Sequence, residues 1–194
     1  MPTNTQLPAS SRRRPARSLG LPRGLTERLC RVDLLLCDVD GVLTDGSILI
    51  GANTEVKSFH IQDGLGLSAL RRAGIRVGWI SSRASAATTR RAKELKIDFL
   101  RQEKRSKVEV IEELLARQKL GWEEVCYVGD DIVDIGPLKR AGVGIAVANA
   151  VPEVVAQADY VTRARGGNGA VREVCELILK AQDLWQGILT SYLS

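Results

Sequence analysis

From residue 32 onward, short runs of apolar residues alternate with segments that have helical spacing. The strand-like runs lie at 32–37, 75–80, 97–100, 125–128, 143–147 and 159–161. The helical segments between them lie at 65–73, 84–95, 108–118, 132–141 and 170–182. This alternation predicts an α/β domain, Rossmann-like and doubly wound, with a mostly parallel sheet.

Several residues indicate where these helices begin and end. Gly74 and Gly142 each follow a basic residue and an alanine, as expected where a helix ends and turns into the next strand. Ser106 and Glu109 have the spacing of a capping box, which predicts a helix that begins at Lys107.

One segment interrupts the alternation directly after the first strand. Residues 47–50 and 55–60 are extended in character, and the Gly-Ala-Asn-Thr sequence at 51–54 separates them. This pattern predicts a β-hairpin. A hairpin at this position would stand over the carboxyl end of the sheet, where open α/β folds bind ligands. We expect it to serve as a flap or as an oligomer contact.

The distribution of charge divides the chain. Of its 28 basic side chains, five arginines lie in residues 1–24, which contain no acidic residue, so the rest carries 23 of each sign. We expect residues 1–24 to be a disordered basic leader, with an organelle transit peptide as the alternative. A charge-neutral body argues against nucleic acid as a partner. The absence of a long apolar run argues against a membrane span, so we expect a cytoplasmic protein.

Carboxylates gather where two predicted strands end. Asp38 and Asp40 follow the first strand, and Asp130 and Asp131 follow the fourth, with Asp134 one helical turn later. Parallel neighbouring strands would bring both groups to one edge of the sheet, where their charges repel unless a cation lies between them. The chain has one histidine and four scattered cysteines, which gives no zinc pattern. Oxygen ligands alone favour Mg²⁺.

A hydroxyl group and an ammonium group come from other strand and helix ends. Ser81 follows the second strand, and Lys107 opens the helix before the fourth. Alone, each has an ordinary interpretation: a turn hydroxyl and a solvated helix lysine. Together with the carboxylates and a metal ion, they describe phosphoryl transfer to an aspartate nucleophile.

The order of these motifs resembles that of the haloacid dehalogenase superfamily of Mg²⁺-dependent phosphatases. The matching positions are D-x-D-G-V-L-T-D-G at 38–46, then Ser81, Lys107 and G-D-D-x-x-D at 129–134. Residues 62–66 and 158–173 further resemble a branch that acts on sugar-acid phosphates. The resemblance implies a phosphatase domain over 25–182, with 183–194 as a C-terminal tail. It also implies a place in the pathway to bacterial lipopolysaccharide.

The same resemblance assigns roles to individual residues. It implies that Asp38 is the nucleophile, and that Asp40 protonates the leaving oxygen and then activates water. It implies a Mg²⁺ site formed by Asp38, Asp130 and the backbone carbonyl of Asp40, with support from Asp131 and Asp134. Ser81 and Lys107 would hold the phosphoryl group. Asp63 and Arg83 are predicted to bind the sugar acid.

The short distance between the first two strands bears on assembly. Only 40 residues separate Asp40 from Ser81, and the hairpin and one helix fill them, so we expect no separate cap domain. The resemblance implies a homotetramer in which neighbouring subunits cover an open site. The Gly-rich segment 166–169 would then be a mobile segment that reaches a neighbour, or a simple loop before the last helix.

Three alternatives have different consequences. A signalling receiver domain uses similar residues, but its acid pair lies on the first strand and its acceptor on a later one, unlike the order here. A phosphatase-like domain without activity would serve only in oligomerisation; the presence of Asp38, Asp40, Lys107 and Asp130 argues against it. Within the phosphatases, another phosphorylated ulosonate, such as a nonulosonate 9-phosphate, remains an alternative substrate.

Overall fold

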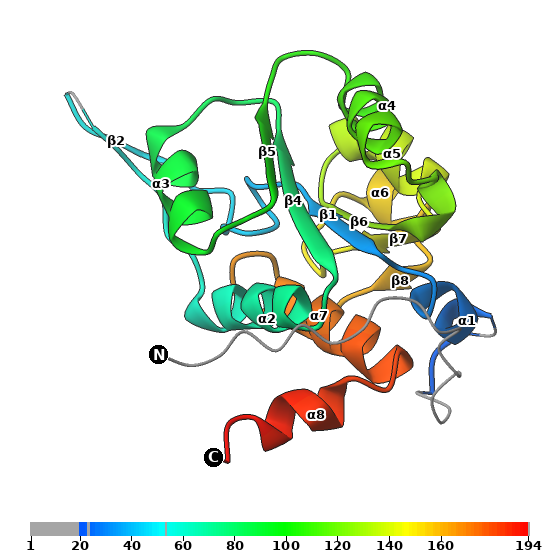
Figure 1. Ribbon diagram of the computed structural model, residues 1–194. Coiled ribbons are helices and arrows are strands. Elements are labelled where there is room, and N and C mark those ends of the chain that lie inside the picture. Colours follow the sequence, from blue (N-terminus) through cyan, green and yellow to red (C-terminus); the bar gives the residue numbers. More distant parts are fainter. Residues whose placement is uncertain (1–19, 23, 53, 194) are drawn as a thin grey trace.

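The computed structural model describes residues 20–22, 24–52 and 54–193 (Figure 1). Most of the expected basic leader at 1–24 therefore lies outside the described residues. In the described part of the chain, no helix is long and apolar enough to cross a membrane.

A six-stranded parallel sheet forms the centre of the molecule. Its order is β5, β4, β1, β6, β7 and β8. The bounds in that order are Phe99–Gln102, Arg76–Ser81, Leu34–Cys37, Val125–Gly129, Val143–Ala146 and Tyr160–Val161. The predicted strands and the parallel doubly wound arrangement are confirmed. Since β1 lies between β4 and β6, residues after these three strands meet at one edge.

Helices cover both faces of the sheet (Figure 1). On one face lie α1 (Leu25–Leu29), α2 (Ile61–Arg72) and α7 (Ala170–Ala181), and on the other lie α4 (Lys107–Gln118), α5 (Ile135–Arg140) and α6 (Pro152–Val155). The alternation of side chains along β1 divides the core accordingly: Leu35 and Cys37 belong to the first cluster, and Leu34 and Leu36 to the second. Burial on both faces explains the uninterrupted apolar run of this strand.

Several boundaries differ from the expectation. The segment 132–141 is two elements, a 3₁₀ turn at Ile132–Asp134 followed by α5, because the Asp134 carboxylate accepts from the backbone of the residues that enter the turn. Helix α4 begins at Lys107 as predicted, but the Ser106 side chain makes no capping hydrogen bond. Residues 183–194 contain a helix that was not expected, α8 (Trp185–Thr190), and Trp185 and Ile188 pack against the core.

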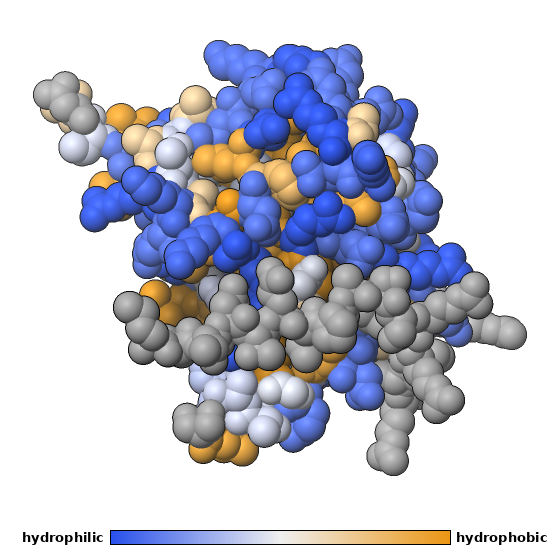
Figure 2. All heavy atoms as spheres, viewed as in Figure 1, coloured by the Kyte–Doolittle hydropathy of each residue, from blue (hydrophilic) through white to orange (hydrophobic). Residues whose placement is uncertain are grey.

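The predicted hairpin is present but short. Strands β2 (Leu49–Ile50) and β3 (Glu55–Val56) pair antiparallel and project from the body (Figure 1). Helix α3 (Ala86–Glu94) lies beside its base. Hydrophobic side chains line this projecting arm (Figure 2), and Leu49 and Ile50 are 68% and 80% exposed. The described chain forms no cap domain between β1 and β4.

Candidate active site

The predicted catalytic groups follow three adjacent strands at one edge of the sheet. Cys37, the last residue of β1, is in register with Trp79 of β4 and Val128 of β6. Asp38, Ser81 and Asp130 therefore each lie one or two residues beyond this aligned row of three residues. The sequence placed these residues at strand ends, and the strand order now makes them neighbours.

Lys107 binds two carboxylates at this edge. Its Nζ lies 2.9 Å from Asp38 Oδ1 and 2.6 Å from Asp134 Oδ1. Asp134 also accepts a hydrogen bond of 2.6 Å from the Tyr127 hydroxyl and one of 3.0 Å from the Asp130 amide. Lys107 and Asp134 are 5% and 0% exposed. The ammonium group is therefore a buried partner of both carboxylates, and its interpretation as a solvated lysine is wrong.

A glycine allows the loop after β1 to approach β6 closely. Gly41 has φ of +97°, and a Cβ built on it would lie 2.0 Å from Asp130 Oδ2. A side chain would therefore clash with a carboxylate and also strain the backbone. The D-x-D-G sequence brings the two acidic loops into contact because its last residue has no side chain.

The acidic residues form a group that fits a metal ion. Asp38, Asp130 and Asp134 each offer a carboxylate oxygen, and these atoms lie within 4.8 Å of one another. Asp130 Oδ1 is buried and has no hydrogen-bond partner among the described residues. Three carboxylates around one lysine leave unbalanced negative charge, and a hard divalent cation such as Mg²⁺ would balance it.

Burial and mutual repulsion shift the pKa values in this group. Burial, with the nearby Asp134 charge, raises the pKa of Asp38 to about 6, although Lys107 opposes the rise. Burial and the Asp38 charge raise the pKa of Asp130 to about 8. Burial lowers the pKa of Lys107, but Asp38 and Asp134 outweigh it, so the pKa lies above its usual value. Without a cation the ionised carboxylates are therefore costly, and the ammonium is favoured.

Two other predicted residues have local partners. The Ser81 hydroxyl donates to the Arg83 carbonyl at 3.0 Å and accepts from the Arg83 amide at 3.1 Å, which closes the turn after β4. Asp131 accepts from the Ile132 amide at 2.7 Å and is exposed. Of the two acids expected behind the metal ion, Asp134 lies within the cluster, whereas Asp131 caps the following turn.

Asp40 and Arg83 contact Lys57 and Glu55, two residues that the sequence did not mark as part of a site. Lys57, which follows β3, has its Nζ 2.6 Å from Asp40 Oδ1 and 2.9 Å from Oδ2. Arg83 forms an ion pair with Glu55 of β3. Nothing in the local sequence marks Lys57, because its partner lies 17 residues earlier and hydropathy favours an exposed position.

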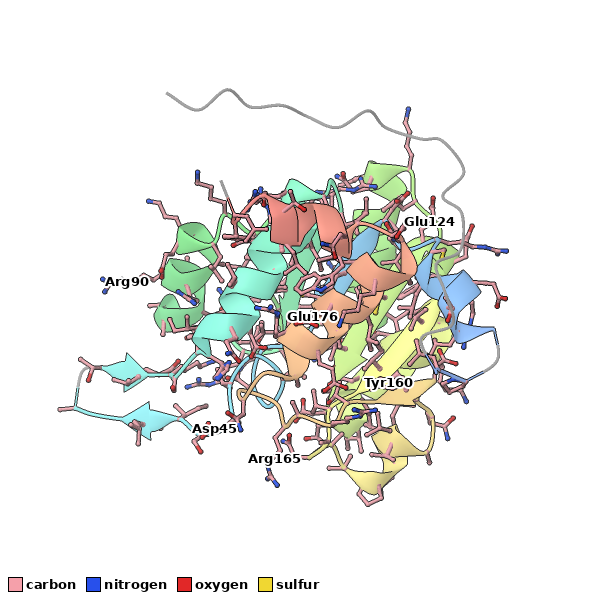
Figure 3. The ribbon with its side chains drawn as sticks, turned by 90° about the horizontal axis from the view of Figure 1, so that it is seen from below. Asp45, Arg90, Glu124, Tyr160, Arg165 and Glu176 are labelled. Carbon is pink, nitrogen blue, oxygen red and sulfur yellow. The ribbon has the colours of Figure 1, made fainter. Side chains whose placement is uncertain are left out.

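The Gly-rich segment packs on the loop after β1 of its own chain. A Cβ on Gly166 would lie 1.7 Å from the Gly41 carbonyl oxygen, and the Gly167 amide donates to the Val42 carbonyl at 2.8 Å. Figure 3 shows Asp45 and Arg165 in the two loops that meet here. In this structure the segment supports the loop after β1 rather than extending away from it.

Asp63, which is predicted to bind the sugar acid, has backbone partners in this structure. Its carboxylate accepts from the amides of Arg172 at 2.6 Å and Gly169 at 3.3 Å, so it joins α2 to the start of α7. It is 2% exposed. Both carboxylate oxygens accept from backbone amides, and the contact with substrate stays a prediction.

Comparison with protein families and known proteins points to one group. Residues 81–174 match the family model for haloacid dehalogenase-like hydrolases. The chain is 43% identical to the 3-deoxy-D-manno-octulosonate 8-phosphate phosphatase of Yersinia pestis over 162 residues, which cover 83% of this chain and 87% of that protein. The enzyme of the same name from Escherichia coli K12 is 42% identical over 152 residues, or 78% and 81% of the two chains.

Solved structures agree with these matches. The phosphatase of the same name from Moraxella catarrhalis, in complex with magnesium, phosphate and 3-deoxy-D-manno-octulosonate, has a TM-score of 0.85 and 41% identity. That alignment covers 87% of this chain and 97% of that one. A cobalt-bound phosphatase from Haemophilus influenzae has a TM-score of 0.78 and 38% identity over 84% and 99% of the chains.

Proposed function

Since this chain belongs to the haloacid dehalogenase-like hydrolases, in the branch of the 3-deoxy-D-manno-octulosonate 8-phosphate phosphatases, we propose that it hydrolyses that phosphate ester with Mg²⁺. Members of this branch are phosphoric monoester hydrolases. The observation that carries the proposal is the group of Asp38, Asp130 and Asp134, in which Asp38 and Asp134 pair with the buried Lys107. We propose further that the free sugar acid enters lipopolysaccharide biosynthesis.

In the proposed mechanism Asp38 attacks the phosphorus atom. The P–O bond to the sugar breaks, and an aspartyl-phosphate forms on Asp38. Lys107, already paired with Asp38, holds a phosphoryl oxygen and keeps the nucleophile in place. Ser81 donates its hydroxyl hydrogen to another phosphoryl oxygen, for which it exchanges its partner in the turn.

Asp40 moves the protons in both halves of the reaction. It donates a proton to the sugar oxygen as that oxygen leaves, and it then accepts one from the water that hydrolyses the aspartyl-phosphate. Water adds to phosphorus and releases Asp38, so the enzyme returns to its starting state. Asp38, Asp130 and the Asp40 carbonyl would hold Mg²⁺, which would supply positive charge against the phosphoryl oxygens.

We also propose that four chains assemble through the hairpin. Support comes from the apolar side chains of Leu49, Ile50 and Val56, which are 68%, 80% and 54% exposed on an arm that projects from the body. Exposed apolar residues on a projecting segment are typical of a subunit contact. We propose a cytoplasmic location, as for the enzyme's soluble substrate.

The proposed function is tested by phosphate release from a panel of sugar phosphates. We expect rapid, Mg²⁺-dependent turnover of 3-deoxy-D-manno-octulosonate 8-phosphate and its loss in EDTA. Preference for a nonulosonate 9-phosphate would move the substrate assignment to that class. No turnover of any phosphorylated ulosonate would contradict the proposal.

A further inference from the structure

Lys57 is a buried lysine at the base of the hairpin. Its side chain is 0% exposed, and its Nζ lies 2.6 Å and 2.9 Å from the two carboxylate oxygens of Asp40. Thr88 Oγ1, at 3.4 Å, is a further polar neighbour. The preceding residue, Val56, is 54% exposed. At the end of β3 the apolar side chain of Val56 is therefore exposed and the charge of Lys57 is buried, the reverse of what hydrophobic burial favours.

A second set of contacts fixes the segment that carries Lys57. Glu55 accepts a hydrogen bond of 2.7 Å from the Ser85 hydroxyl and pairs with Arg83. Glu55 Oε1 also lies 3.9 Å from the Lys57 Nζ. These contacts join the hairpin to the segment between β4 and α3. Lys57 is therefore held in place by the body of the protein as well as by its contact with Asp40.

Asp40 depends on such a partner for its orientation. It lies beyond the end of β1, next to Gly41 with its positive φ, so no sheet hydrogen bonds fix it. Among the described side chains, only Lys57 lies within hydrogen-bonding distance of its carboxylate. A group that exchanges a proton with substrate must be aligned closely, because small misplacements are costly in rate.

We propose that Lys57 is a positioning residue, which holds the Asp40 carboxyl in the orientation from which it exchanges protons with the leaving oxygen and with water. This inference rests on the proposed function and extends it to a residue outside the predicted site. Its corollary is that the hairpin contributes to catalysis through Lys57. A change that detaches the hairpin would slow the chemical step with little effect on substrate affinity.

The first test compares Lys57→Met with Lys93→Met, which removes an exposed lysine of α3. On the sugar phosphate we expect Lys57→Met to lower kcat at least about tenfold and to leave KM within about threefold, since aligned proton transfer is worth 10²–10⁴ in rate. The loss should be smaller on p-nitrophenyl phosphate, whose leaving group departs without a proton. Lys57→Gln, which retains a donor, should recover part of the rate. Lys93→Met should match the wild type.

The second test combines Lys57→Met with Asp40→Asn. If Lys57 acts through Asp40, the double variant should be no slower than Asp40→Asn alone. Independent, multiplying losses would contradict the proposal, and so would an effect of Lys57→Met on KM alone. Thermal unfolding of the same four proteins measures the contact between Lys57 and Asp40 independently of activity. It also identifies a variant that folds poorly.

Failure of the proposed function is distinguishable from failure of this inference. If the wild type does not hydrolyse the octulosonate phosphate, the substrate assignment fails, and the cycle is run on whichever alkyl phosphate it does hydrolyse. Non-additive losses there would still support a role for Lys57 through Asp40. Additive losses, or none, would overturn it.

Discussion

Asp38 and Asp134 pair with the ammonium group of Lys107, and Asp130 brings a third carboxylate oxygen within 4.8 Å of theirs. Burial raises the pKa values of Asp38 and Asp130; the Asp134 charge adds to the rise for Asp38, and the Asp38 and Asp134 charges add to it for Asp130. The arrangement stores electrostatic repulsion that a bound cation would relieve. The repulsion that destabilises the metal-free protein is therefore the same repulsion that favours binding of a cation.

The raised pKa values give the metal-free protein a defined pH dependence. With Asp38 at about 6 and Asp130 at about 8, the folded state binds more protons than the unfolded state between pH 4 and pH 8. This site therefore loses stability as pH rises through that window. Mg²⁺ should raise the melting temperature more at pH 8 than at pH 5.5, by roughly 4 °C or more. In Asp130→Asn this difference should shrink; an equal Mg²⁺ effect at both pH values would contradict the account.

Alanine substitutions at Gly41 and Gly74 distinguish the effect of a steric clash from that of backbone strain. Gly41→Ala would place a Cβ 2.0 Å from Asp130 Oδ2, whereas Gly74, with φ of +84°, has no atom within 4 Å of its Cβ position. Gly74→Ala should cost about 1 kcal/mol in denaturant unfolding and retain full activity. Gly41→Ala should cost more stability and lower kcat at least about a hundredfold, because it would displace Asp130, a proposed metal ligand. Equal effects of the two substitutions would contradict the close approach described here.

At the scale of elements, what the sequence predicted depended on local signals. The buried strands were found because their apolar runs are continuous, and α4 because its start was marked. The short helices α1, α6 and α8 have too few residues for a periodic pattern. The break at residue 134 was missed because Pro137 lies in the first turn of α5, where a helix tolerates proline. Strand order, which makes Asp38 and Asp130 neighbours, follows from packing over the whole sheet.

Contacts between distant residues were the main features that the sequence did not reveal. Asp63 accepts from the Arg172 amide, 109 residues away, and was predicted to bind substrate because it lies in a resembled motif. Lys57 carried no signal at all, since a lysine in an extended segment is usually exposed. The positions of Asp38 and Asp130 at strand ends were predictable, but the contacts of Lys57 and Asp63 were not.

The role of Asp63 in joining α2 to α7 leads to a stability prediction. Asp63→Ala should lower the free energy of unfolding by roughly 2–3 kcal/mol, because two backbone donors lose a charged partner. KM for the sugar phosphate should not change. Glu94→Ala, which removes an acid 64% exposed in a surface ion pair, should cost less than about 0.5 kcal/mol. A raised KM with unchanged stability in Asp63→Ala would restore the predicted contact with substrate.

On the scale of the whole molecule, an open site and a projecting apolar hairpin belong together. The described chain has no cap domain over the carboxyl edge of the sheet, so exclusion of water from the site would require another chain. The hairpin that carries Lys57 also carries the exposed residues Leu49 and Ile50. Assembly would therefore cover apolar surface and stabilise the segment that holds Asp40.

The assembly prediction is tested by light scattering. The wild type should have about four times the mass of one chain, and Ile50→Lys should give smaller species, because a buried unpaired charge opposes association. Ile132→Lys, which changes an isoleucine that is 62% exposed and outside the hairpin, should leave the mass unchanged. A wild type that is monomeric at all concentrations would contradict assembly through the hairpin.

The central claim is that Asp38, within the metal-binding carboxylate group, carries out phosphate ester hydrolysis. It is tested most directly by the rate of phosphate release from 3-deoxy-D-manno-octulosonate 8-phosphate, measured side by side for the wild type and Asp38→Asn in saturating Mg²⁺. We expect the variant to fold and to lose at least about 10⁴ in kcat, as when an enzyme loses its nucleophile. Wild-type turnover by Asp38→Asn would contradict the account.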